Sequence, residues 1–176
     1  MDEDLEPYEV FANQMEEQFP AMFSEPYGGF AIGEGWWPII KSLCANIQSH
    51  IDWRNKTRAK LLESNPYNHP IPDEVEQVVV HQIKEKFGGL RFYYEGGDDE
   101  ISGMVTMAES WASHSCENCG KPATKQTTGW IKNVCDEHFK ESEDRKAEQL
   151  KKYNYNHATE VELAREHKEQ IERGRG

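Results

Sequence analysis

Three cysteines and one histidine in the C-terminal half of the chain are the feature that most constrains its fold. They are Cys116 and Cys119 in a C-E-N-C-G segment and, after fifteen intervening residues, Cys135 and His138 in a C-D-E-H segment. Two ligand pairs with two residues inside each pair are typical of a tetrahedral Zn²⁺ site. Because four protein ligands leave no position for water or substrate, we expect the zinc ion to stabilise structure and not to catalyse a reaction.

The same cysteines have a second interpretation, as a disulfide or a redox-active C-x-x-C motif. That interpretation requires an oxidising compartment or a thioredoxin-like βαβ unit. The chain begins M-D-E-D-L-E-P, without a basic segment followed by an apolar one, so we expect no secretion signal. We therefore expect a cytoplasmic protein with reduced thiols and no membrane association. The fourth cysteine, Cys44, lies on an apolar helical stripe and is predicted to be a core residue.

The charge of the chain is concentrated near its N-terminus. The formal net charge is −12, and the first 40 residues contain nine acidic residues and neither lysine nor arginine. This balance disfavours binding to nucleic acids or anionic membranes. A solvated acidic segment is one interpretation, and an acidic contact surface for a basic partner protein is the other. In the second interpretation Glu16, Glu17 and Glu25 are predicted contact residues.

Hydrophobic periodicity predicts a small α+β core that is mainly helical. Apolar residues recur every three or four positions over residues 9–18, 38–62 and 101–112, and each stretch is predicted to be a helix. A further helix is expected from Asp73, with Glu76 three residues later as in a capping box. It would end at the glycine pair after residue 87, although its run of valines also favours a strand.

The segment L-R-F-Y-Y-E at residues 90–95 alternates large apolar residues with other side chains and predicts a half-buried strand. Arg91 and Tyr93 would lie on the exposed face of that strand, where they are predicted to contact a partner.

The cysteine–histidine region is expected to form a small module of its own. C-E-N-C-G resembles a zinc knuckle, residues 124–128 and 130–134 are predicted to pair as a hairpin, and a helix is expected to begin at the second ligand pair. Knuckle, hairpin and helix in this order are the treble-clef arrangement. We therefore predict a C-terminal treble-clef-like zinc module.

Four segments follow from these patterns. They are an acidic N-terminal segment with a loop (1–35), a helical/β core (36–113), the zinc module (114–152) and a charged C-terminal tail or helix (153–176). The last segment is expected to be a solvated, partly frayed helix that Thr159 caps, or a helix that pairs with a partner.

Treble clefs also occur in nucleases, which need a general-base histidine and a second metal. His114, Asp136 and Glu137 form no such pattern, so we predict no enzymatic activity and no catalytic residues. The helix after Cys135 mixes both charges, and the lysines of the hairpin provide only a weak basic patch, so nucleic acid is an improbable partner.

Four motifs occur together over residues 20–140: F-G-G-L-R-F-Y-Y, I-x-G-x-V-x-x-A-E, C-E-x-C-G and G-W…C-x-x-H. In this combination the chain resembles a group of small uncharacterised proteins of tailed bacteriophages and prophages. The resemblance implies a phage origin and a place in the cytoplasm of a bacterial host. It supplies no catalytic residues.

Three functional hypotheses follow. The first is a non-enzymatic, zinc-stabilised phage accessory protein that binds, and thereby inhibits or recruits, a host defence or nucleic-acid-processing factor. The second is a nucleic-acid-binding zinc module that uses the hairpin lysines and stacking on Tyr93. The third is a pocket for a small ligand, such as a nucleotide, lined by Trp36, Trp37, Tyr93 and Tyr94, although these aromatic side chains fit the core better.

Overall fold

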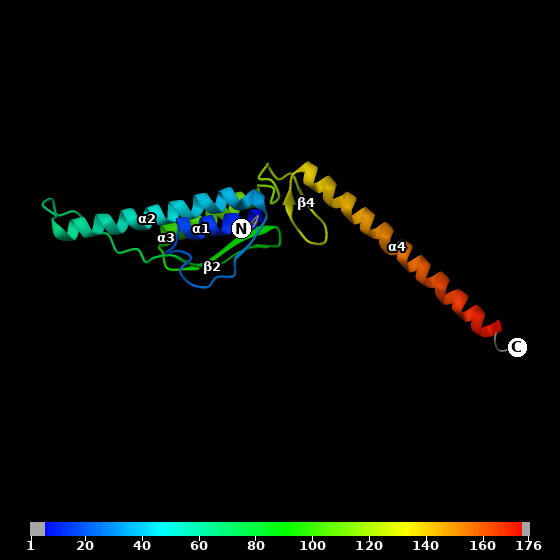
Figure 1. Cartoon of the computed structure of the whole chain (residues 1–176). Helices are drawn as coiled ribbons and strands as arrows, with labels where there is room; N and C mark the ends of the chain where they lie inside the picture. Colours follow the sequence, from blue (N-terminus) through cyan, green and yellow to red (C-terminus); the bar gives the residue numbers. More distant parts are fainter. Residues whose placement is uncertain (1–5, 174–176) are drawn as a thin grey trace. The chain divides into compact units, whose positions relative to one another are not determined.

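The computed structural model describes residues 6–173. The chain divides into two compact units at residue 136, and each is described by itself. The elements in chain order are α1 (Pro7–Gln18), β1 (Phe30–Ala31), the 3₁₀ turn η1 (Glu34–Trp36), α2 (Trp37–Glu63), β2 (Val79–Lys86), β3 (Gly89–Glu95), α3 (Asp99–Ser113), β4 (Lys125–Gln126), β5 (Asn133–Val134) and α4 (Asp136–Arg173) (Figure 1). The predicted α+β, mainly helical class is confirmed.

The three helices of the first unit begin where their sequences favour it. Helix α1 starts with a capping box between Glu6 and Glu9 and with a proline in its first turn. Helix α2 likewise has Pro38 in its first turn. In α3 the N-cap Asp98 accepts a hydrogen bond from the Ile101 amide at 3.0 Å. The three predicted helices are therefore confirmed, as is the strand over residues 90–95.

The prediction of a helix that begins at Asp73 is wrong. Residues 73–78 adopt no regular structure, and β2 occupies the rest of that stretch. The β-branched valines around residue 79 favour a strand. Strands β2 and β3 form an antiparallel hairpin whose two-residue turn is Phe87 and Gly88, with φ values of 54° and 78°. Positive φ at both residues is the type I′ geometry that matches strand twist.

A bulge in β2 explains why the sequence of this strand has a helix-like spacing of apolar residues. The pairing register shifts between Val80 and Gln82, so that the strand contains one extra residue. As a result Val80 and Ile83, three positions apart, are both fully buried. A spacing of three between buried residues is the helical signature, and here the bulge produces it in a strand.

The sheet has the order β1-β2-β3, with β1 parallel and β3 antiparallel to β2. Helices α2 and α3 pack against each other, and α3 packs on β3, so that the helices cover one side of the sheet (Figure 1). The most deeply buried side chains, each at most 1% exposed, include Met15, Met22, Trp36, Ile40, Cys44, Ile47, Val78, Val80, Ile83, Leu90 and Ile101. The prediction that Cys44 is a core residue is confirmed, and burial raises the pKa of its thiol to about 12.

The second unit is a single helix, α4, which continues without a break through residue 153. The expected cap at Thr159 is wrong, since this residue lies inside the helix and its hydroxyl donates to the Tyr155 carbonyl at 3.0 Å. A threonine hydroxyl bonded back to the preceding turn does not interrupt a helix. The division into four segments stays a prediction.

Candidate metal centre

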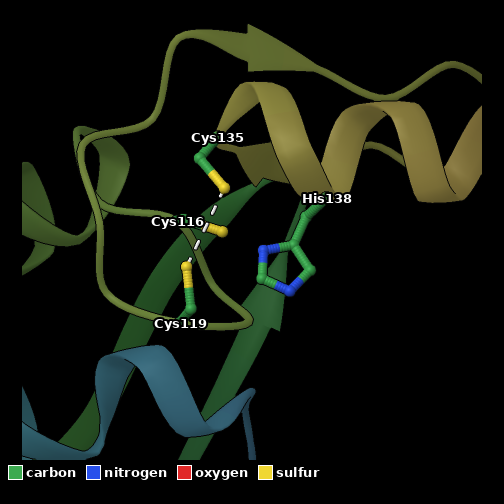
Figure 2. A group of neighbouring side chains, drawn as sticks. All are labelled: Cys116, Cys119, Cys135 and His138. Carbon is green, nitrogen blue, oxygen red and sulfur yellow. Dashed lines mark hydrogen bonds between the residues drawn. The ribbon is translucent and has the colours of Figure 1, made fainter.

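The four predicted metal ligands come from three parts of the chain. Cys116 and Cys119 lie on a loop that directly follows α3, Cys135 follows β5, and His138 is in the first turn of α4. Figure 2 shows the three sulfur atoms and one ring nitrogen of the histidine turned toward a common centre. The chain therefore brings together all four residues that the spacing predicted.

The distances between the ligand atoms fit one metal ion. One ligand atom from each residue lies within 4.8 Å of the others, and the sulfurs of Cys119 and Cys135 are 3.8 Å apart. In a tetrahedral site with metal–sulfur bonds of about 2.3 Å, two sulfurs are separated by about 3.8 Å. The four residues can thus hold a metal ion with little rearrangement.

A carboxylate on the same helix lies near the outer nitrogen of the histidine ring. Nε2 of His138 lies 3.9 Å from Oε2 of Glu141, one turn further along α4. The other ring nitrogen, Nδ1, faces the sulfurs (Figure 2). A carboxylate hydrogen-bonded to the second nitrogen commonly holds a metal-bound histidine in one tautomer, and Glu141 is placed to make that bond after a small shift of its side chain.

The surroundings of Cys116 favour its thiolate form. Burial acts to raise the pKa of this thiol, but backbone amides of Cys135, Cys119 and Asn118 donate to its sulfur and together lower the pKa. The pKa of Cys119 is raised instead, by burial and by its proximity to the two other thiols. Three thiolates repel one another, and a metal ion held by the four residues would offset that repulsion.

The loop that carries Cys116 and Cys119 is fastened to the start of α2. The Trp36 indole donates to the Ser115 carbonyl at 3.0 Å, and the Gly35 amide donates to the Glu117 carbonyl at 2.8 Å. A Cβ atom at Gly35 would collide with the Cys116 carbonyl and the Gly120 amide. Glycine is thus required here because the two backbones approach each other so closely.

An ion pair between a buried glutamate and a partly exposed lysine lies beside the cluster and was not predicted from the sequence. Glu117, only 2% exposed, accepts a hydrogen bond from the Lys132 ammonium at 2.9 Å. Its backbone amide also donates to the Asn133 carbonyl at 3.0 Å. These bonds join the cysteine loop to the hairpin. A glutamate between two cysteines gives no sequence signal of burial, since glutamate is normally exposed.

The hairpin is shorter than predicted, with β4 and β5 pairing over two residues each. It packs on the turn between β2 and β3, where the Asn133 amide donates to the Gly88 carbonyl at 2.7 Å. The Trp130 indole likewise donates to Glu85 at 3.0 Å. These contacts connect the hairpin to the core.

The predicted partner-binding residues do not gather at the metal centre. Glu16, Glu17 and Glu25 are exposed, and Glu16 accepts a hydrogen bond from the Tyr27 hydroxyl at 2.8 Å. Arg91 lies 3.6 Å from Glu109. Tyr93 is 40% exposed, with the Lys84 ammonium 5.1 Å from its ring centre.

A groove of about 760 Å³ between α2 and α3 was not predicted. It ends at Cys119 and Gly120, and Met107 and Trp111 border it. The sequence shows that apolar residues occupy two faces of α3, but it does not show which of them stays exposed. One face contains Ile101, Val105, Ala108 and Ala112, and the other contains Met104, Met107 and Trp111. The first face is buried in the core, whereas on the second face only Met104 packs against the core, and Met107 and Trp111 are each 64% exposed.

Neither the family models nor the curated proteins and solved structures gave a significant match to this chain. Among residues 6–173, no helix combines the length and the apolar composition that a membrane crossing requires.

Proposed function

We propose that the protein is a non-enzymatic, zinc-stabilised accessory protein of phage origin that binds a basic surface of a host protein. The zinc ion holds the cysteine loop to the start of α4, and an acidic surface on the core makes the contact. The defence and nucleic-acid-processing factors of a bacterial host are the partners that this surface would suit, because proteins that hold nucleic acids present basic surfaces.

The choice of zinc is supported by the donor set. Three thiolates and one imidazole suit Zn²⁺ better than calcium or magnesium, which prefer oxygen ligands. Four protein ligands complete a tetrahedron, so the ion would have no free position for a substrate. The order of cysteine loop, hairpin and ligand-bearing helix supports a treble-clef-like module.

The exposed face of α1 is the observation that carries the proposed contact. Phe11 and Met15 are buried on one side of this helix, whereas Glu9, Glu16 and Glu17 are exposed on the other. Carboxylates on an ordered helix form a fixed negative surface, which steers a basic partner and sets its orientation. Asp2, Glu3 and Asp4 lie outside the described residues.

Affinity capture tests the proposal. The zinc-loaded full-length protein is immobilised and exposed to a bacterial lysate, and the bound proteins are quantified by mass spectrometry at low and high salt. We expect a stoichiometric partner with a basic surface, whose binding weakens as salt screens the carboxylates. Recovery of no stoichiometric partner would contradict the proposal.

A charge-neutral variant locates the contact. Glu16→Gln, Glu17→Gln and Glu25→Gln together remove three charges, and glutamine at position 16 keeps an acceptor for Tyr27. The matched control neutralises Glu148, Glu160 and Glu162, which are exposed on α4. We expect only the first variant to lose the partner. Equal binding by both variants would exclude the carboxylates of α1 and of the loop after it as the contact surface.

A further inference from the structure

The three cysteines of the candidate metal centre are not equally open to solvent. Cys116 and Cys135 are 0% and 6% exposed, whereas Cys119 is exposed. Cys119 also borders the groove between α2 and α3. Because the oxidation of a thiol depends on access to its sulfur, Cys119 is the cysteine that a small dissolved oxidant reaches most easily.

A second sulfur lies close enough to Cys119 to form a bond with it. The sulfurs of Cys119 and Cys135 are 3.8 Å apart and face each other across the site (Figure 2). A disulfide needs a separation of about 2.05 Å, so the two sulfurs have to approach each other by about 1.8 Å. Cys135 belongs to the second ligand pair and follows β5. A bond between these sulfurs would therefore join the cysteine loop to the hairpin.

Cys116 is the less suitable partner for Cys119. It lies with Cys119 in one tight turn, in which the Gly120 amide donates to the Cys116 carbonyl at 2.8 Å. Three backbone amides, those of Asn118, Cys119 and Cys135, also donate to its sulfur. A disulfide within this turn would pull the Cys116 sulfur away from those amides, whereas a bond between Cys119 and Cys135 leaves that sulfur where it is.

We propose that Cys119 is a site of oxidation by hydroperoxides and that the oxidation joins it to Cys135 in a reversible disulfide. The Cys119 thiolate attacks one peroxide oxygen, so that the O–O bond breaks and the sulfur becomes a sulfenic acid. The other oxygen takes up a proton and leaves as water, or as an alcohol from an organic peroxide. The Cys135 thiolate then attacks the Cys119 sulfur, the S–S bond forms, and the hydroxyl group takes up a proton and leaves as water. The two thiols lose two electrons, which the peroxide gains.

The disulfide removes two of the four candidate metal ligands. Cys116 and His138 remain, and two donors are too few for a tetrahedral site, so the metal ion is released. The new bond joins the cysteine loop to the hairpin, which the hydrogen bond from the Glu117 amide to the Asn133 carbonyl also does. Removal of the metal by a chelator leaves these two segments without a covalent bond. Peroxide and a chelator should therefore leave the region in different states.

Treatment of the zinc-loaded full-length protein with hydrogen peroxide tests this inference. Zinc release is measured with a chromogenic chelator against an untreated sample, and disulfides are mapped by mass spectrometry of non-reduced peptides. We expect one Cys119–Cys135 disulfide for each zinc ion released, and recovery of both thiols and of zinc binding after addition of dithiothreitol and Zn²⁺. Cys44 is the control within the same chain, because it is 0% exposed. It should react at least about tenfold more slowly than Cys119.

Two results of this experiment would overturn the inference. One is zinc that stays bound while the peroxide oxidises glutathione in the same solution. The other is zinc release without a disulfide, or with a disulfide that contains Cys116.

Hydrogen exchange separates the disulfide from simple loss of the metal. Over residues 116–119 and 133–135, the oxidised protein should exchange at least about tenfold more slowly than the chelated protein, because the disulfide constrains the opened state. Equal exchange in the two samples would contradict the proposed bond. No partner protein enters these tests, so their result is independent of the proposed contact with a host protein. A chain that takes up no zinc would contradict the metal centre on which this inference rests.

Discussion

Asp98 holds the start of α3 in two ways. One carboxylate oxygen caps the Ile101 amide, and the other lies 2.8 Å from Nε2 of His50, whose side chain is only 8% exposed. His50 belongs to α2, and its ring also lies 3.4 Å from a carboxylate oxygen of Glu100 in the first turn of α3. Burial acts to raise the pKa of Asp98, and the hydrogen bonds from His50 and Ile101 outweigh it and lower the pKa.

We predict that Asp98→Ala lowers the free energy of unfolding at neutral pH by about 1 kcal/mol, because the cap is lost. The folded pKa is depressed, so the stability that the charge contributes is present above the unfolded pKa of about 3.9 and is lost as the pH falls through the folded value. Asp98→Asn retains a capping oxygen without the charge. Its deficit relative to wild type in urea titrations should therefore shrink below about pH 3.9. A deficit that is constant with pH would refute the charge contribution.

Near the candidate metal centre, Gly35 is the position at which an added methyl group should lower the free energy of unfolding most. Gly35→Ala forces the α2 start away from the cysteine loop, and we expect a loss of about 1–3 kcal/mol of unfolding free energy. Gly103→Ala is the matched control, since a Cβ there meets nothing within 4 Å. That change lies inside a helix and should stabilise by about 0.5–1 kcal/mol. Thermal unfolding of the two variants should therefore shift in opposite directions, and equal shifts would contradict the close approach.

At the level of elements, helices α1, α2 and α3 were predictable because residues that favour a helix start precede an apolar stripe with helical spacing. In α3 an N-cap aspartate precedes a regular apolar face, and no run of β-branched residues in this segment favours a strand instead. Strand β2 was not predictable, because its bulge imposes a helix-like spacing on a strand. Only the run of valines and the turn residues after it favour a strand.

Helix α4 extends 35 residues beyond His138, the candidate metal ligand that it carries, to Arg173. Deletion of residues 153–176 should reduce the helical circular dichroism signal yet leave zinc content and the melting temperature of the remainder unchanged, because the deleted turns supply no ligand. Deletion from residue 137 onward is the contrasting variant and should abolish stoichiometric zinc binding. If the shorter deletion also released the metal, the distal helix would have a structural role that we do not assign to it.

At the scale of the whole molecule, metal ligands and core are largely separate. The most deeply buried apolar side chains come from the helices and the three-stranded sheet. The cysteine loop is joined to them by a few hydrogen bonds, such as that from the Trp36 indole to Ser115. Stability is therefore expected to be non-uniform, with the metal sustaining one region only.

Removal of the metal tests this separation. After chelation at neutral pH, we expect hydrogen exchange to accelerate over residues 115–138, while β2, β3 and the centre of α2 keep their protection. Restoring Zn²⁺ should reverse the change. Loss of protection throughout the chain would show that the core depends on the metal, and no change anywhere would remove the proposed structural role.

The candidate site was predictable to the extent that it is local. The ligand set follows from the spacing of four residues, because two short pairs suffice to define a tetrahedral site. The Glu117–Lys132 pair and the groove were not predictable, because both depend on which surfaces meet. Trp111 illustrates the difference, since its place in an apolar stripe is clear from the sequence and its exposure is not.

X-ray absorption at the zinc edge of the purified protein, combined with metal analysis, tests the central claim most directly. We predict one zinc per chain, coordinated by three sulfurs at about 2.3 Å and one nitrogen at about 2.0–2.1 Å. Cys119→Ser should lose one sulfur from the first shell or lose the metal. A wild-type first shell that contains a water oxygen, or fewer than three sulfurs, would contradict a closed structural site.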